Sequence, residues 1–392
     1  MIKGEMMSYN ADVSFNYFAP TKVIFGVGSI SEIPLEVSAL GKKAVLVTDP
    51  GIIKAGMVDQ VKKIMGDTLL GIFSDIPQDT GMEVIDAGAK YAKSLGADVI
   101  VSLGGGSSID TAKGMCIVMK EGKSMRDFQG MQMLTRPQTP HIVIPTTAGT
   151  GSEVTSAAVI LDKEQQQKII IYEYYNTPRV AILDPKMTEK LPPKLTASTG
   201  MDALTHAVES YVSVQRNPIS DALALYAIRL VSGYLQNAVE NGSDMVSRGQ
   251  MQIAALLAGW AFSNSLLGMV HAMAHSLGAV MGLPHGLANG LCLPHVMRFN
   301  LEEIPDLMSD IAEAMGVNVR GMDPKEAGEA GIKEIEALIE KVGLPKKLRE
   351  VGVTEQDIQK SSALAMSDGS IVYNPRMVMD SQEVLEVFKK AF

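Results

Sequence analysis

The stretch DVIVSLGGGSSIDTAKGMCIVMK, residues 98–120, decides the fold class of this chain. Its apolar start predicts a buried strand, its three glycines predict a tight turn, and residues 109–120 predict a helix. Glycine has no side chain to cover the backbone amides at such a helix start, so these amides can bind a pyrophosphate. The spacing differs from G-x-G-x-x-G, because Ile109 stands at the third glycine position. Residues 104–107 are therefore a candidate dinucleotide site, with a merely tight turn as the alternative.

Strands and helices alternate on both sides of this stretch. Short apolar runs predict strands at 44–49, 68–73 and 141–145. Apolar residues at helical spacing predict helices at 52–65 and 81–95. This alternation indicates βαβ units and a parallel sheet, whose ligands bind beyond the carboxyl ends of the strands.

Two further groups lie at predicted strand ends. The loop PTTAGTGSE, residues 145–153, follows one strand with small hydroxyl residues and glycines that suit contact with a ribose or a phosphate. Asp49 ends another strand, where a carboxylate accepts hydrogen bonds from the hydroxyls of an adenosine ribose. Asp49 can equally cap a helix that begins at Pro50, and spacing alone leaves the two roles about even.

The pattern changes after LDPKMTEKLPPKL, residues 183–195, which has three prolines, five charged residues and no strand or helix period. Helices are predicted beyond it, at 196–212, 220–239, 247–265 and around 324–342. We therefore expect an α/β domain with a parallel sheet over residues 1–190 and an all-α domain over residues 191–392.

Histidines gather in one quarter of the chain. Five of the six lie between residues 200 and 295: His206, His271, His275, His285 and His295. Asp202 lies four residues before His206, and His271 four before His275, so each pair shares one helix face. A carboxylate and several imidazoles indicate a metal site with nitrogen and oxygen ligands. Any one of these histidines alone would favour an ordinary packing role, and the clustering reverses that balance.

Composition excludes several classes of protein. A net charge of −9 disfavours nucleic acid and anionic membranes as partners. Only two cysteines occur, Cys116 and Cys292, which predicts a reducing, cytoplasmic compartment. The first residues lack the apolar core of a signal peptide, and the longest apolar run, residues 253–262, is far short of the ~20 residues of a membrane span.

Five motifs, in order, resemble those of the iron-containing alcohol dehydrogenases, a family that includes lactaldehyde reductase, 1,3-propanediol dehydrogenase and butanol dehydrogenases. They are GGGSSIDTAK, PTTAGTGSEVT, GMDALTHAVE, the histidine stretch at 271–285 and NPR at 374–376. The resemblance covers nearly the whole chain. It implies a dehydroquinate synthase-like architecture, in which a dinucleotide-binding α/β domain and a helical metal-binding domain enclose the active site between them.

The resemblance also assigns residues. It implies that the metal ligands are Asp202, His206, His271 and His285. His275 would line the site without binding the metal, and we expect it to be catalytic, relaying or orienting the substrate proton, with plain packing as the alternative. His295 would be structural. The cofactor contacts would be Asp49, Gly104, Gly105, Gly106, Ser107, Thr146, Thr147, Thr155 and Lys168.

These assignments predict transfer of a hydride between a short primary alcohol or diol and a nicotinamide cofactor. The resemblance implies Fe²⁺ as the metal; a ligand set without thiolate does not demand zinc, and Zn²⁺ is the alternative. NAD is expected over NADP, because Asp49 would repel a 2′-phosphate. The partners would be a small alcohol or aldehyde and further copies of the chain, as a dimer or a larger homo-oligomer.

Two departures and four alternatives accompany this reading. Gln78 and Asp79 replace the second and third residues of the common P-N-P-T motif, and Asp368-Gly369-Ser370-Ile371 replaces D-A-C-T, so cofactor contacts and substrate range are open there. The alternatives are a dehydroquinate-synthase-like lyase, a glycerol-dehydrogenase-like enzyme, a metallohydrolase and a non-catalytic binding protein. The lyase would need a basic cluster, but residues 200–295 hold no lysine and only three scattered arginines.

Overall fold

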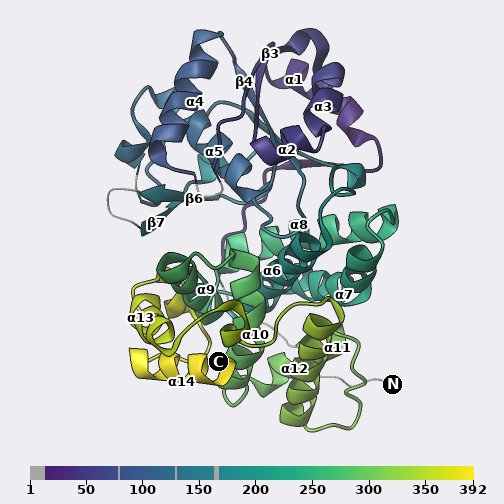
Figure 1. Ribbon diagram of the computed structural model, residues 1–392, viewed down its shortest axis with the longest axis vertical. Helices are drawn as coiled ribbons and strands as arrows, with labels where there is room; N and C mark the ends of the chain where they lie inside the picture. The colour runs from purple at the N-terminus through teal and green to yellow at the C-terminus, as the bar shows by residue number, and fades with distance from the viewer. Residues whose placement is uncertain (1–13, 78–79, 129, 163–166) are drawn as a thin grey trace.

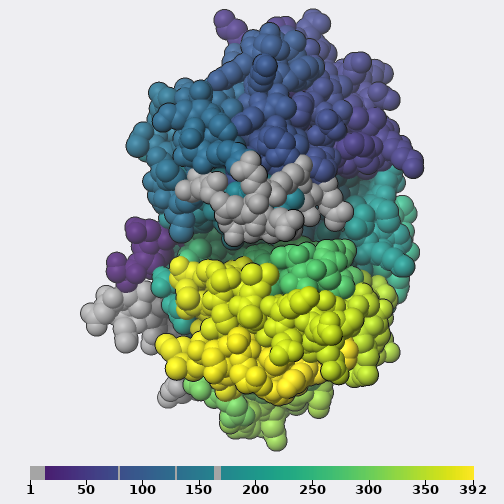
Figure 2. Space-filling view, turned by 60° about the vertical axis from the view of Figure 1, so that its left-hand side comes forward, coloured from purple at the N-terminus to yellow at the C-terminus, as the bar shows by residue number. Residues whose placement is uncertain are grey.

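The structure is a computed structural model that describes residues 14–77, 80–128, 130–162 and 167–392. It has an α/β part, built around a parallel sheet, and an all-helical part stacked along the long axis of the molecule (Figure 1). The predicted fold class is confirmed. Residues 355–391 lie beside residues 269–300 on the face shown in Figure 2.

The α/β part contains a six-stranded sheet in which every neighbouring pair is parallel, in the order β1-β8-β5-β4-β2-β3. Its strands are β1 (Lys22–Phe25), β2 (Ala44–Thr48), β3 (Leu69–Phe73), β4 (Val99–Gly104), β5 (His141–Pro145) and β8 (Val180–Leu183). The chain moves outward from β2 to β3 and then crosses back to β4. The carboxyl ends of β2 and β4 therefore flank the switch point where such sheets bind ligands.

Helices cover both faces of this sheet. They are α1 (Ile33–Leu40), α2 (Pro50–Lys54), α3 (Met57–Met65), α4 (Met82–Ser94) and α5 (Gly106–Glu121). Val45 and Val47 of β2 pack on the side of α4 and α5, whereas Ala44 and Leu46 pack on the side of α1 and α3. Both faces are covered, so β2 and β4 are buried along their whole length and consist mostly of apolar residues.

Two local predictions were incomplete. Residues 52–65 were expected to form one helix, but Gly56 adopts φ +74° and separates α2 from α3. Glycine adopts this left-handed conformation without steric cost. The helical spacing of the apolar residues therefore continues across the break, although the helix itself does not. The antiparallel hairpin of β6 (Ala157–Asp162) and β7 (Gln167–Tyr172) was not predicted.

The helical part contains α6 (Pro193–Val212), α7 (Pro218–Glu240), α8 (Met245–Ser265), α9 (Met269–Met281), α10 (His285–Asn300), α11 (Pro305–Ala314), α12 (Pro324–Lys341), α13 (Glu355–Ala365) and α14 (Ser381–Ala391). Seven short 3₁₀ helices complete the described chain: Ser29–Glu32, Gly66–Thr68, Met125–Phe128, Tyr174–Asn176, Pro185–Met187, Leu348–Val351 and Gly369–Tyr373. Within the described ranges, no single helix combines the length and apolarity of a membrane span; α8 and α9, bent by 103°, meet that test only as a pair.

The loop after β5 ties the two parts together. Gly151, at φ +60°, lies so close to α8 that an added Cβ would come within 2.6 Å of the Gly259 Cα. Val154 and Leu183 also pack against Leu256 of α8. The predicted loop therefore reaches from the sheet edge to the helices. The division of the chain into domains at residue 190 stays a prediction.

Candidate active site

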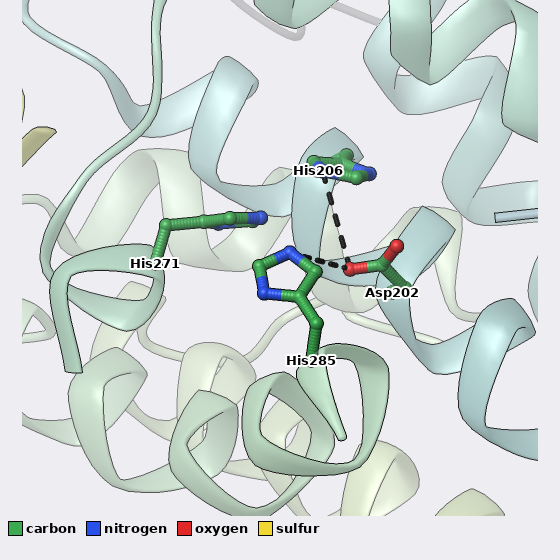
Figure 3. Close-up of side chains that lie close together, drawn as sticks. All are labelled: Asp202, His206, His271 and His285. Atoms are coloured by element: carbon green, nitrogen blue, oxygen red, sulfur yellow. Dashed lines mark ion pairs between the residues drawn. The ribbon is translucent and has the colours of Figure 1, made fainter. Parts of the chain in front are cut away.

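Three helices bring the four predicted metal ligands together. Asp202 and His206 lie one turn apart on α6, His271 lies on α9, and His285 is the first residue of α10. One ligand atom from each of the four lies within 4.8 Å of every other, and their side chains converge (Figure 3). In the part of the chain that the structure describes, His295 does not join this group.

A close approach of two helices places His285. An added Cβ on Gly286 would lie 2.4 Å from the carbonyl oxygen of Ser198, so only glycine fits between α10 and α6. This contact puts Nε2 of His285 3.5 Å from Oδ1 of Asp202. The sequence LPHG thus spans the end of the loop before α10 and the start of that helix. Its glycine, Gly286, fixes the position of His285.

Hydrogen bonds fix which ring nitrogens face the cluster. Nδ1 of His206 lies 3.3 Å from the carbonyl oxygen of Gly149, which can only accept, so Nδ1 carries the proton and Nε2 a lone pair. Nδ1 of His271 lies 2.5 Å from Oε2 of Glu209, and this carboxylate also accepts from the Val270 N–H. A carboxylate behind a histidine in this way orients it as a metal ligand.

The donor set fits a divalent metal. Nδ2 of Asn289 lies 2.7 Å from Oδ1 of Asp202, 3.1 Å from Nε2 of His271 and 3.2 Å from Nε2 of His285. One amide has two N–H groups, so it cannot serve three acceptors at once. Lone pairs that converge in excess of donors suit a cation with nitrogen and oxygen ligands, a set that iron, cobalt and zinc all accept.

Burial favours the uncharged form of two imidazoles of the cluster, those of His206 and His271. Burial lowers the pKa of His206, and it lowers the pKa of His271 well below its usual value. Burial likewise raises the pKa of Glu209 to about 8, against the hydrogen bonds from neighbouring backbone amides. The contact between Nδ1 of His271 and Oε2 of Glu209 lies on the side of the ring away from the cluster, so Nε2 is directed at the cluster. Neutral imidazoles are the form that binds a metal.

The candidate cofactor residues lie at the carboxyl edge of the sheet. Asp49 follows β2, and its Oδ1 accepts from the amides of Gly51 at 2.9 Å and Ile52 at 3.2 Å, so it caps α2. Its Oδ2 accepts from the Ser108 hydroxyl at 3.1 Å. The capping role weighed from the sequence is thus present, and a ribose contact stays a prediction.

The start of α5 and the loop after β5 lie side by side. The Thr146 amide donates to the carbonyl oxygen of Gly104 at 3.0 Å. An added Cβ on Gly105 or Gly106 would come 3.2 Å from the methyl groups of Thr147 or Thr150. The glycines therefore let the loop and the helix start pack closely while their amides stay at the sheet edge.

A cavity of about 220 Å³ joins the helix start to the metal cluster. Its lining includes Gly106, Ser107, Thr155, the four cluster residues and His275. Asp49, Gly104, Gly105, Thr146 and Thr147 stand at the strand ends outside this lining. Lys168 pairs with Leu161 through its backbone in β7, and its side chain lies outside the described residues, as do Gln78 and Asp79.

Lys113, a buried lysine that was not predicted as a site residue, supports Thr155. Nζ of Lys113 donates to Oγ1 of Thr155 at 3.1 Å, to Oγ of Ser152 at 3.0 Å and to the carbonyl oxygen of Ala157 at 2.6 Å. Burial lowers the pKa of Lys113 to about 8, although Asp110 favours its charged form. This lysine joins α5, the loop after β5 and β6 into one support for the cavity wall.

His275 faces the same cavity and has a carboxylate behind it. Its Nδ1 lies 2.7 Å from Oδ2 of Asp368, and Oδ1 of that carboxylate accepts from the amide and the hydroxyl of Ser370. Burial would raise the pKa of Asp368, but the His275 and Ser370 contacts hold it well below its usual range. Asp368, Glu209 and Asn289 were not predicted. Glu209 offered a signal, three residues after His206 on the same helix.

Family models match both parts of the chain. A model described as iron-containing alcohol dehydrogenase matches residues 20–185, and one described as the C-terminal part of the Fe-containing alcohol dehydrogenase family matches residues 196–392. These two matches include both the sheet edge and the metal cluster.

Proteins and solved structures similar over their full length agree. The chain is 41% identical to 1,3-propanediol dehydrogenase of Klebsiella pneumoniae, over 98% of this chain and 100% of that protein. A crystal structure of 1,3-propanediol oxidoreductase superposes with a TM-score of 0.94 at 40% identity, over 97% of this chain and 100% of that one. The structure of sulfoacetaldehyde reductase from Bifidobacterium kashiwanohense in complex with NAD⁺ gives 0.88 at 28% identity, over 97% and 99%. The chain therefore belongs to the iron-containing alcohol dehydrogenase family.

Proposed function

We propose that this chain is a metal-dependent alcohol dehydrogenase that interconverts a primary alcohol and its aldehyde with NAD. One observation carries the proposal: a single cavity is lined both by the N-terminal turn of α5 and by the cluster of Asp202, His206, His271 and His285. A site that can stabilise charge on a substrate oxygen would thus lie next to a site for a dinucleotide. Neither a metallohydrolase nor a simple binding protein needs both sites. The family membership favours the same choice over a lyase.

The proposed metal is Fe²⁺, which the family description supports, with Zn²⁺ as the alternative. When bound, the metal acts as a Lewis acid that stabilises negative charge on the substrate oxygen. Glu209 and Gly149 hold His271 and His206 so that each presents Nε2 to the cluster. Because these rings are positioned before substrate arrives, little reorganisation accompanies the reaction.

The proposed cofactor is NAD, which a structural relative binds. The amides at the start of α5, around Gly105, Gly106 and Ser107, would hold its pyrophosphate. Asp49 would accept from the adenosine ribose and Gly104 would shape the turn. The remaining parts of the cofactor would be contacted by Thr146, Thr147, Thr155 and Lys168. The nicotinamide would then extend along the cavity toward the cluster.

The reaction moves one hydride and one proton. A bound nicotinamide would supply the acceptor for the hydride of the carbinol carbon, and the substrate hydroxyl would give up its proton as the carbonyl forms. His275 lines the cavity, and its Nδ1 is held by Asp368, so its Nε2 is the acceptor for that proton directly or through water. Phe262 and Leu267 line the same space and limit water around the reacting atoms.

The proposal is tested by following NADH absorbance with metal-reconstituted protein in both directions. We expect NADH to form with primary alcohols and NAD⁺, and to disappear with aldehydes. Protein stripped of metal with a chelator is the control and should be inactive until metal is restored. Reconstituted protein that turns over no alcohol or aldehyde would overturn the proposed function.

The compartment and the assembly are also proposals. Cys116 and Cys292 are both free and buried, which supports a reducing, cytoplasmic setting. We keep a dimer or larger homo-oligomer as the expected assembly, to be measured by sedimentation.

A further inference from the structure

A second, larger cavity adjoins the one that holds the metal cluster. Its volume is about 490 Å³, within the range of small-molecule sites. The two cavities share His275, Ser370, Phe262 and Leu267 among their lining residues. A substrate whose carbinol lies at His275 therefore extends its remaining carbons into the larger space.

The wall of the larger cavity is mostly apolar. It is formed from β6, β7, α8, α9 and α13, and its apolar side chains include Met131, Val159, Ile170, Leu266, Ala279 and Leu364. Burying apolar carbon against such a wall stabilises binding in proportion to the area removed from water.

Three hydroxyl groups in this wall already donate to backbone carbonyl oxygens. Oη of Tyr172 donates to the carbonyl oxygen of Ser263 at 2.6 Å, Oγ of Ser276 to that of Met273 at 2.7 Å, and Oγ of Ser367 to that of Leu364 at 2.7 Å. These hydroxyls still offer lone pairs, but a second hydroxyl on the substrate would exchange its water for few acceptors along a mostly apolar wall. The wall thus disfavours a polar tail.

We propose that the preferred substrates are primary alcohols and aldehydes with an extended apolar tail, rather than short diols or other polyols. This inference rests on the proposed function and names the substrate class of the same site. His275, Asp368 and Ser370 form the polar end of the space, where the reacting oxygen lies. The apolar remainder selects the tail.

The test is a homologous series with the metal-reconstituted protein and NAD⁺, from ethanol through butanol and hexanol to octanol, together with 1,3-propanediol. We expect kcat/KM to rise roughly fourfold for each added methylene up to hexanol, the value given by the transfer of one methylene from water. Butanol should exceed 1,3-propanediol by about tenfold, because the diol places a hydroxyl where butanol places carbon.

Two substitutions should shorten the cavity. Ala279 lies four residues after His275 on α9 and lines the space, and an added Cβ on Gly369 meets no atom within 4 Å. Ala279→Phe and Gly369→Leu should each lower the octanol-to-propanol ratio of kcat/KM by roughly tenfold. Ala363→Phe, at an exposed position of α13 outside either cavity lining, is the matched control and should leave the ratio unchanged.

The outcomes separate the two proposals. A flat or falling series, a diol that equals butanol, or a ratio unmoved by both cavity substitutions would overturn the substrate class while leaving an alcohol dehydrogenase. Absence of turnover with every alcohol and aldehyde would overturn the proposed function itself, and the substrate class with it.

Discussion

Nδ1 of His275 lies 2.7 Å from Oδ2 of Asp368, and the two residues come from sequence segments 93 positions apart. The carboxylate accepts from Nδ1, so Nε2 on the opposite side of the ring is the acceptor. Because Ser370 fixes the other carboxylate oxygen, the histidine ring has one preferred orientation. Asp368 is in this sense a positioning residue for His275.

His275→Ala should retain its metal and lose activity. General acid–base groups contribute about 10²–10⁴-fold, so we expect kcat to fall by at least about 100-fold with the pH profile of kcat flattened. Asp368→Asn removes the charge that orients the ring and should lower kcat less than His275→Ala does. His275→Ala kinetics that match the parent at every pH would show that the ring only packs.

The choice of cofactor should depend on the charge of Asp49. Asp49→Asn keeps an oxygen that can cap α2 but removes the charge that would repel a 2′-phosphate. We expect the ratio of kcat/KM for NAD to that for NADP to fall by about tenfold or more in this variant. Asp49→Gly should lower the ratio as well, with a loss of only about a few tenths of a kcal/mol in stability from the missing side-chain cap. A parent that prefers NADP, or an unchanged ratio in both variants, would leave Asp49 as a cap alone.

Stability should fall in mild acid because of a histidine in the sheet. His141 is buried in β5, with Nε2 2.8 Å from the Ser102 hydroxyl, and burial together with Lys113 lowers its pKa to about 3. Between the ordinary pKa of about 6.5 and pH 3, the unfolded chain binds a proton that the folded chain does not. Folding therefore loses stability as pH falls through this window, by about 2 kcal/mol at pH 5 from this group.

Urea denaturation at pH 7 and pH 5 measures this effect. His141→Gln cannot titrate, so its free energy of unfolding should change less between the two pH values than that of the parent, by about 2 kcal/mol. Equal changes in both proteins would mean that other groups, such as His295, whose pKa burial lowers to about 4, account for the acid loss.

Oxygen should distinguish the metals. Ferrous iron at this site has no thiolate ligand and would be oxidised in air, so iron-loaded protein should lose activity during aeration and recover when Fe²⁺ and reductant are added. Zinc-loaded protein should keep whatever activity it has. An iron-loaded sample that stays fully active through prolonged aeration would contradict iron as the working metal.

Four strands of the sheet, β2 to β5, could be predicted because each is a short apolar run, whereas β1 and β8 were not predicted. HIVIP became β5 at the predicted residues, and AVLVT became β2. The hairpin of β6 and β7 could not be predicted in this way. Its strands AAVILD and QKIIIY lie outside the parallel sheet and pair antiparallel with each other. An apolar run alone does not indicate such a pairing.

The four residues of the cluster were named from the sequence, and their role as metal ligands stays a prediction; the groups that support them were not predicted. Asp202 and His206 share a helix face, and spacing makes such pairs visible. Asp368 is 93 residues from His275 and Lys113 is 42 from Thr155, so neither partnership has a local signature. Gly286 is visible as a glycine, but the need for it comes from α6, whose position against α10 only the fold determines.

Metal content in single-site variants tests the central claim most directly. After reconstitution with Fe²⁺ or Zn²⁺, Asp202→Ala, His206→Ala, His271→Ala and His285→Ala should each hold far less metal than the parent by elemental analysis, and should lose activity in parallel. His295→Ala lies on the same helix as His285 but outside the cluster, and should hold metal like the parent. Full metal occupancy in His285→Ala, or a parent that binds no metal after reconstitution, would contradict the account.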